Sequence, residues 1–191
     1  MLYSTLRKFL WLVWRIFFRV RITGAENLPK TGAYLLSGNH ISSYDPISLA
    51  ICTKRQLHFM GKKELFENRI YGGCLRAVGA FPVDRGNIDM KAYRHAMDIL
   101  NQGRPLAIFS QGTRMRDYSN VKNGAAMFSL KTGAPIVPVG INSSYRIFSS
   151  LTINIGTPIS MEPYKDMKIK SELVEEVMSK VVEQVSALSK Q

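Results

Sequence analysis

The sequence has few cysteines. Its two, Cys52 and Cys74, stand singly in apolar surroundings. A disulfide framework or a structural zinc site needs cysteines, or cysteines with histidines, at short characteristic spacings, and none occurs here. We therefore expect two reduced core cysteines of a cytoplasmic protein, with no bound metal and no cofactor.

A long apolar run is lacking as well. The stretch 9–14 is far shorter than the roughly 20 residues that a membrane-spanning helix needs, and Arg15 follows it directly. The chain also lacks repeats, low-complexity tracts and long linkers. Its 191 residues, 46% of them hydrophobic, therefore predict one globular domain with a sizeable core.

Acidic residues are scarce beside basic ones. The 26 Lys and Arg against 14 Asp and Glu give a net charge of +12, which favours an anionic partner. Such a partner could be nucleic acid, an acidic membrane surface, an acidic carrier protein or a phosphorylated substrate. We expect no nucleic acid, because zinc-ligand spacing, a basic leucine-zipper pattern and an aromatic RNA-binding signature are all missing.

The N-terminal segment has the pattern of an amphipathic helix. On a helical projection of residues 2–20, Ser4, Lys8, Arg15 and Arg19 share one narrow face, and aromatic and aliphatic side chains cover most of the rest. The alternative is a buried helix packed on the domain. We predict that residues 1–20 bind an anionic membrane surface peripherally, on the cytoplasmic face of the cell membrane, and that residues 21–191 form the main domain.

Strand and helix patterns alternate along the remaining chain, which predicts an α/β fold with a mixed, mainly parallel central sheet flanked by helices. The expected strands are residues 34–37, 58–61, 80–83, 106–109, 136–141 and 151–155. The expected helices include residues 88–101, 124–131 and 168–190, the last with one apolar face that packs on the domain.

An imidazole and a carboxylate stand five residues apart in segment 39–45, directly after the apolar run 34–36. His40 can take a proton from a hydroxyl if Asp45 holds the other ring nitrogen as a donor. Five residues exceed one helical turn, so this pairing needs a turn that folds Asp45 back on His40, and the glycine, serines and proline nearby favour one. The alternative is an exposed loop histidine, with Asp45 capping a following helix.

Two later segments suit a phosphate group. Segment 79–85 is extended and apolar and ends in Arg85, whose planar cation can make bidentate phosphate contacts. Segment 110–114 follows an apolar strand and combines a glycine, a hydroxyl and Arg114, so that backbone N–H groups and a guanidinium can meet one anion. Segment 134–141 reads as a buried strand, and we assign it no catalytic role.

In this order, these segments resemble the glycerophospholipid acyltransferase family, whose typical members are the 1-acylglycerol-3-phosphate acyltransferases. The resemblance runs from about residue 20 to residue 159 and includes segments 61–66 and 122–126. It implies that His40 and Asp45 are the catalytic pair. The residues that it implies bind substrate are Asn39, Arg85, Gln111, Gly112, Thr113, Arg114 and Lys122.

Gln111 departs from the family pattern, which usually has glutamate at this position. The amide keeps the shape and an acceptor oxygen but loses the negative charge. We interpret it as a tolerated variant in an active enzyme. The other interpretation is that the acceptor differs from lysophosphatidic acid.

The resemblance implies an O-acyltransferase of phospholipid biosynthesis. Its donor would be a thioester of acyl-carrier protein or coenzyme A, its acceptor lysophosphatidic acid and its product phosphatidic acid. Direct attack by the acceptor hydroxyl needs no serine nucleophile, and no Gly-x-Ser-x-Gly elbow is present. Two alternatives stay open: transfer to glycerol 3-phosphate or another lysolipid, and a non-catalytic lipid-binding protein.

Overall fold

The computed structural model of the chain describes residues 2–84, 86, 89–109 and 123–191. In this part of the chain, seven strands form one sheet in the order β1-β7-β6-β2-β5-β3-β4. The strands are β1 Arg19–Thr23, β2 Leu35–Gly38, β3 His58–Lys62, β4 Ala80–Val83, β5 Leu106–Phe109, β6 Ile136–Ser143 and β7 Ser150–Ile155.

The sheet is mixed and mainly parallel, as predicted. Strands β2 to β6 all run in one direction, whereas β7 is antiparallel to β6 and β1 is parallel to β7. The carboxyl ends of β2, β3, β4, β5 and β6 therefore meet at one edge of the sheet, where open sheets of this type build their sites. We call this edge the carboxyl edge.

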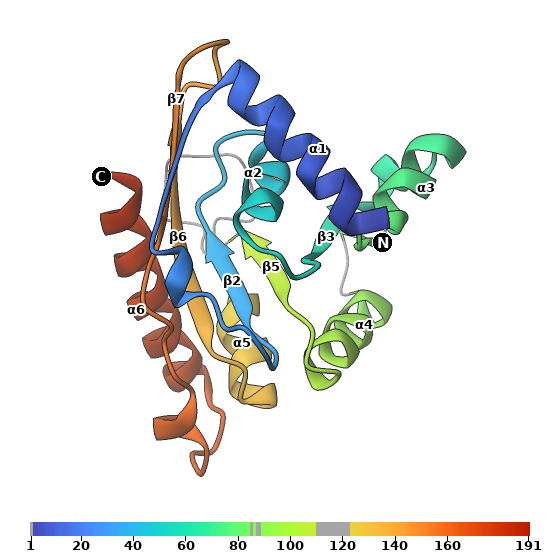
Figure 1. The fold of residues 1–191 in the computed structure, drawn as a ribbon. Coiled ribbons are helices and arrows are strands. Elements are labelled where there is room, and N and C mark those ends of the chain that lie inside the picture. Colours follow the sequence, from blue (N-terminus) through green and yellow to red (C-terminus); the bar gives the residue numbers. More distant parts are fainter. Residues whose placement is uncertain (1, 85, 87–88, 110–122) are drawn as a thin grey trace.

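Helices cover both faces of the sheet (Figure 1). They are α1 Leu2–Phe17, α2 Asp45–Cys52, α3 Arg69–Ala77, α4 Met90–Asn101, α5 Gly124–Thr132 and α6 Ser171–Ser189. Short 3₁₀ turns lie at Ala25–Asn27, Lys63–Phe66 and Glu162–Tyr164. Residues of α4, α5 and α6 pack on one face, and residues of α1 and α2 pack on the other.

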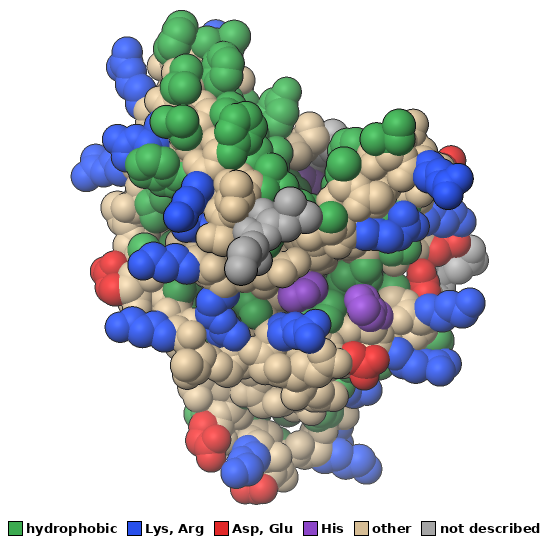
Figure 2. All heavy atoms as spheres, turned by 45° about the vertical axis from the view of Figure 1, so that its right-hand side comes forward, with side chains coloured by type: hydrophobic (Ala, Val, Ile, Leu, Met, Phe, Trp, Pro, Cys, Tyr) green, Lys and Arg blue, Asp and Glu red, His purple; other side chains and the backbone are tan. Residues whose placement is uncertain are grey.

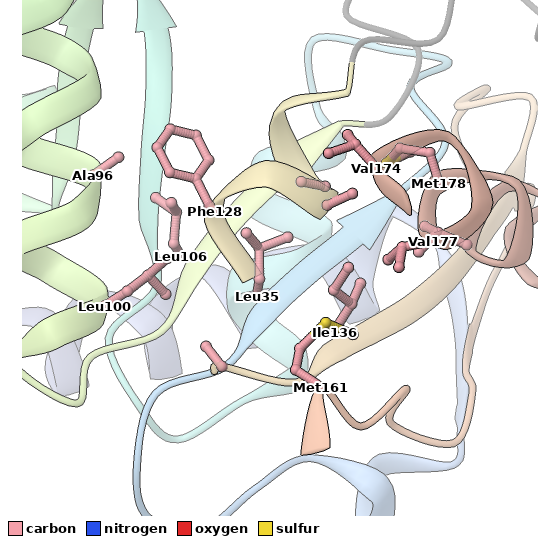
Figure 3. Packing of buried hydrophobic residues seen from close by; sticks show 14 of the residues in the cluster. Leu35, Ala96, Leu100, Leu106, Phe128, Ile136, Met161, Val174, Val177 and Met178 are labelled. Atoms are coloured by element: carbon pink, nitrogen blue, oxygen red, sulfur yellow. The ribbon is translucent and has the colours of Figure 1, made fainter. Parts of the chain in front are cut away.

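The two faces of the sheet carry separate hydrophobic clusters. Leu35 of β2 lies in the cluster under α4, α5 and α6, and the next residue, Leu36, lies in the cluster under α1 and α2. Successive strand residues point to opposite faces, so a strand covered on both sides is apolar throughout. Figure 3 shows the first cluster, which includes Phe128 and Val177 from the helices and Ile136 from β6. Fully burying each such side chain contributes about 1.5–3 kcal/mol.

Helix α6 lies directly on β6, as its predicted apolar face required. Val177, Val181 and Val185, spaced at i and i+4, have no exposed surface. A Cβ atom at Gly140 would lie 2.3 Å from the carbonyl carbon of Leu188, so glycine is needed where helix and strand backbones meet. This close approach fixes the helix over the strand.

The N-terminal helix is shorter than predicted. It ends at Phe17, because Arg19 to Thr23 leave the helix and pair with β7. The backbone hydrogen bonds of a strand cannot be combined with helical ones. The prediction that Arg19 shares a helical basic face with Lys8 and Arg15 was therefore wrong.

The cysteines are not both core residues. Cys52 is partly buried, its thiol donates to the carbonyl of Ser48 at 3.1 Å, and burial raises its pKa to about 12. Cys74, in contrast, is exposed on α3. The prediction was wrong for Cys74 because apolar neighbours in sequence do not face the same side of a short helix.

Candidate active site

The turn from β2 into α2 begins with Asn39, which is tied to β6. The side-chain N–H of Asn39 donates to the carbonyl of Ile141 at 2.8 Å, and the backbone N–H of Ile141 donates to Oδ1 of Asn39 at 2.7 Å. The side chain is buried. Asn39 thus fixes the start of the turn, while its predicted contact with substrate stays a prediction.

His40 and Asp45 form a buried pair at the carboxyl edge. The Nδ1 of His40 lies 2.7 Å from Oδ2 of Asp45, and the two residues are 7% and 0% exposed. The same Oδ2 accepts the backbone N–H groups of Ile41 and Ser42, both at 2.7 Å. The turn therefore folds Asp45 back on His40, as predicted, and the alternative of an exposed loop histidine was wrong.

This contact sets the tautomer of the imidazole. Because a buried carboxylate accepts hydrogen bonds, Nδ1 of His40 carries the proton, and Nε2 is the unprotonated nitrogen. The ring also stacks on Phe109 at the end of β5, with centroids 4.2 Å apart and planes 15° apart. A ring held in this way can accept a proton at Nε2, and Asp45 stabilises the resulting imidazolium.

The second carboxylate oxygen has a partner that the sequence did not suggest. The hydroxyl of Tyr145 donates to Oδ1 of Asp45 at 2.7 Å. Burial and the negative charge of Asp45 raise the pKa of Tyr145, so the phenol keeps its proton. Tyr145 follows β6, and its place after a strand that ends at the carboxyl edge was the one available signal.

The segments predicted to bind phosphate follow strands that end at this same edge. Strand β4 ends at Val83 and β5 ends at Phe109, and β5 pairs with β2. The predicted residues themselves lie outside the described part of the chain: Arg85, Gln111, Gly112, Thr113, Arg114 and Lys122. Among the described residues, no group of three or more His, Cys, Asp or Glu is arranged to hold a metal ion.

Comparison with known proteins agrees with this fold. A family model described as Acyltransferase matches residues 19–142. The 1-acyl-sn-glycerol-3-phosphate acyltransferase of Bacillus subtilis is 31% identical over 160 residues, which cover 81% of this chain and 80% of that protein. The enzyme of the same name from Streptococcus pneumoniae is 32% identical over 179 residues, or 89% of this chain and 66% of that protein.

The fold also matches a solved structure. The crystal structure of the 1-acyl-sn-glycerophosphate (LPA) acyltransferase of Thermotoga maritima superposes with a TM-score of 0.75 at 24% identity, covering 97% of this chain and 80% of that one. This chain and that enzyme therefore share one fold, which includes the mixed sheet described above. With a family model that spans strands β1 to β6 and the His40–Asp45 turn, the chain belongs to the acyltransferase family.

Proposed function

We propose that this protein transfers a fatty acyl group from an acyl thioester to the free hydroxyl of 1-acylglycerol 3-phosphate, forming phosphatidic acid in phospholipid biosynthesis. The buried His40–Asp45 pair at the carboxyl edge carries this proposal. The acceptor is supported by the names of the relatives from B. subtilis and S. pneumoniae.

The reaction follows from the tautomer of His40. Nε2 takes the proton of the acceptor hydroxyl as its oxygen attacks the thioester carbonyl, giving a tetrahedral intermediate. Collapse of the intermediate breaks the carbon–sulfur bond, and the imidazolium returns the proton to the departing thiolate. Asp45 stays ionised throughout and stabilises the imidazolium between the two steps.

We place the acceptor phosphate against the segments that follow β4 and β5. Arg85 and Arg114 would neutralise the anion, while Gly112 and Thr113 would present backbone N–H groups and a hydroxyl. Asn39, Gln111 and Lys122 complete the proposed set of substrate-binding residues. Support comes from the place of β4 and β5, whose carboxyl ends share an edge with His40.

Release of free thiol tests the proposal directly. Acyl-carrier-protein and acyl-coenzyme A donors are each offered with 1-acylglycerol 3-phosphate, glycerol 3-phosphate or no acceptor. We expect acceptor-dependent release with 1-acylglycerol 3-phosphate, and a loss of about two to four orders of magnitude in His40→Ala with the fold intact. Wild-type rates in His40→Ala would contradict the mechanism.

The same assay separates the alternatives that Gln111 keeps open. Release with glycerol 3-phosphate, or with another lysolipid alone, would mean a different acceptor. Release that appears only in Gln111→Glu would mean an impaired natural site. The absence of thiol release with every donor and acceptor would favour a lipid-binding protein. The donor that supports release identifies acyl-carrier protein or coenzyme A as the partner.

We also propose that the protein binds an anionic membrane surface peripherally, on its cytoplasmic side, through α1. Phe9, Leu12 and Ile16 lie on one stripe of the helix and are 59%, 55% and 57% exposed. Lys8 and Arg15 are exposed on the neighbouring face, where they could meet acidic headgroups. In the described residues, no helix is both long enough and apolar enough to cross a membrane.

The loop 144–149, between β6 and β7, extends this surface. Ile147 and Phe148 are 65% and 66% exposed, and the N–H of Phe148 donates to the carbonyl of Phe17 at 2.6 Å, so the loop abuts the end of α1. Figure 2 shows hydrophobic side chains gathered at the top of the molecule, the end at which Figure 1 places this loop and the end of α1. Grouped apolar exposure of this kind is typical of a contact surface.

Charge reversal tests the membrane proposal. We expect Lys8→Glu with Arg15→Glu to weaken binding to vesicles that contain phosphatidylglycerol, without lowering turnover of detergent-dispersed substrate. Unchanged vesicle binding would contradict a basic contact. We retain residues 1–20 as the proposed membrane-association region and residues 21–191 as the acyltransferase domain, although Arg19 and Val20 lie in β1.

A further inference from the structure

A directed chain of hydrogen bonds runs from α1 to the Asp45 carboxylate. Trp14 Nε1 donates to Ser48 Oγ at 3.1 Å, Ser48 Oγ lies 2.9 Å from the Tyr145 hydroxyl, and Tyr145 donates to Asp45 Oδ1 at 2.7 Å. An indole N–H can only donate, and an ionised carboxylate can only accept. Ser48 must therefore donate its one proton to Tyr145, and every bond in the chain points toward Asp45.

The two oxygens of the carboxylate are held differently. Among the described residues, Oδ2 accepts from His40 and from the backbone of Ile41 and Ser42, whereas Oδ1 accepts from Tyr145. Three donors hold Oδ2 in place, so the orientation of the carboxylate plane depends on the one donor to Oδ1. Tyr145 thus controls both the rotation of Asp45 and the share of its negative charge that faces His40.

Tyr145 is itself held in an uncommon conformation. Its φ of 51° lies in the left-handed region, which is unfavourable for a residue with a Cβ unless the surroundings fix it. The ring packs edge-on against Phe18, with centroids 5.7 Å apart, and at a tilt of 47° against Tyr44, also at 5.7 Å. The N–H of Tyr145 also bonds to the hydroxyl of Ser143 at 3.0 Å. An unfavourable backbone conformation that is held by these contacts at the edge of a site points to function.

We infer that Tyr145 is a positioning residue, which orients Asp45 through its hydroxyl and so sets the basicity of His40. Ser48 donates to the Tyr145 hydroxyl and Trp14 donates to Ser48, so the orientation of Asp45 depends on the packing of α1. The inference rests on the proposed function, because the reaction is what reports on His40. The effect of Tyr145 on the imidazole passes through the carboxylate of Asp45, to which its hydroxyl donates.

The sign of the effect follows from the charges. Without the Tyr145 hydroxyl, the negative charge of Asp45 is less dispersed and stabilises the imidazolium form of His40 more strongly. Burial raises the pKa of Cys52 to about 12, so this neighbouring thiol stays neutral and does not contribute. The acid side of the pH–rate profile should therefore move to higher pH.

The test is a pH series of kcat and KM for thiol release by wild type and Tyr145→Phe. We expect kcat near neutral pH to fall roughly tenfold, with KM for the acceptor within about twofold of wild type, because the acceptor phosphate is proposed to bind at the segments after β4 and β5. The acid limb should move upward by about half a pH unit or more. A purely structural residue would lower the amount of active protein without moving the limb.

Two further variants keep the test decisive. Tyr44→Phe makes the same chemical change at a neighbouring tyrosine that is 49% exposed, and it should match wild type. Ser48→Ala leaves Tyr145 in place but removes its donor, so it should move the limb in the same direction by less. A Tyr145→Phe limb that coincides with wild type, or one that moves to lower pH, would overturn the inference.

The two proposals fail in different ways. A folded wild-type protein that releases no thiol with any donor and acceptor would overturn the proposed function and the inference together. An active wild type in which Tyr145→Phe behaves like Tyr44→Phe would overturn the inference alone. If circular dichroism shows that Tyr145→Phe is unfolded, the pH–rate profile of Ser48→Ala tests the inference instead. An acid limb that stays at the wild-type pH in Ser48→Ala would then overturn it.

Discussion

The helices at the two ends of the chain, α1 and α6, carry apolar side chains along most of their length, yet they use them differently. Helix α6 buries its apolar face, with Val177, Val181 and Val185 fully covered by the sheet. Helix α1 buries Trp14, whereas its apolar residues Phe9, Leu12 and Ile16 are more than half exposed. One helix is a structural layer of the domain, and the other also offers a surface.

The difference lies in what each helix packs against, rather than in its own pattern. Gly140 removes every side-chain atom from the point where β6 meets α6, so the whole face of the helix can reach the sheet. Helix α1 rests on α2, and Trp14 reaches inward to Ser48 of α2. An amphipathic pattern therefore does not say how much of an apolar face is buried, because the partner decides this.

A charge in the buried face of α6 should have the largest effect. We expect Val181→Asp to lower the free energy of unfolding by about 4 kcal/mol or more, because a carboxylate would lie unpaired in the core. The measurement is urea unfolding followed by circular dichroism. Leu12→Asp, on the exposed side of α1, is the matched control and should change stability by less than about 0.5 kcal/mol. Equal losses would remove the distinction between the helices.

Truncation of Trp14, which is deeply buried, should come next. Trp14 is 7% exposed, and Trp14→Ala should cost about 3 kcal/mol through lost packing and the cavity left behind. Trp14→Phe keeps most of the ring but removes the N–H that bonds to Ser48, and it should cost less. Unfolding midpoints in urea check both. No loss in Trp14→Ala would mean that α1 does not stabilise the domain.

A methyl group at the contact of α6 with β6 should have a smaller effect. Gly140→Ala places a Cβ atom against backbone, and the helix must shift, which should cost about 2 kcal/mol. Gly73→Ala on α3 is the control, since a Cβ there meets nothing within 4 Å. Helix propensity should make that change stabilising by roughly 0.5–1 kcal/mol. Similar losses at both positions would contradict the close approach of α6.

Structural features were predicted correctly from the sequence where the interacting residues lie close together along the chain. The ends of β4 and β5 were predicted correctly, because each is a short apolar run bounded by turn residues. The pairing of His40 with Asp45 was predictable because the two residues are five apart and one turn brings them together. Local chemistry was sufficient in both cases.

Three of the misses share one physical cause, which is pairing between distant segments. Arg19 and Val20, the first two residues of β1, were assigned to the helix before it, because the partner strand β7 lies more than a hundred residues away. Tyr145, likewise, is 100 residues from Asp45 and belongs to no motif. Which part of α1 is covered could not be predicted either, since α2 and the loop 144–149 cover it only in the folded chain.

Removal of the exposed stripe of α1 should have the smallest effect on stability. We expect the triple variant Phe9→Ser, Leu12→Ser and Ile16→Ser to unfold within about 0.5 kcal/mol of wild type, because these side chains are already more than half exposed. Its binding to vesicles, measured by sedimentation, should fall at every salt concentration, since apolar insertion is not screened by ions.

Salt separates the two parts of this contact. Vesicle binding by Lys8→Glu with Arg15→Glu should be weakest relative to wild type at low ionic strength and approach wild type as salt is raised, because exposed charges are screened beyond a Debye length of about 10 Å at 0.1 M. The triple serine variant should show no such convergence. If the serine variant lost stability as Val181→Asp does, the stripe would be part of the core, and α1 would differ from α6 in degree alone.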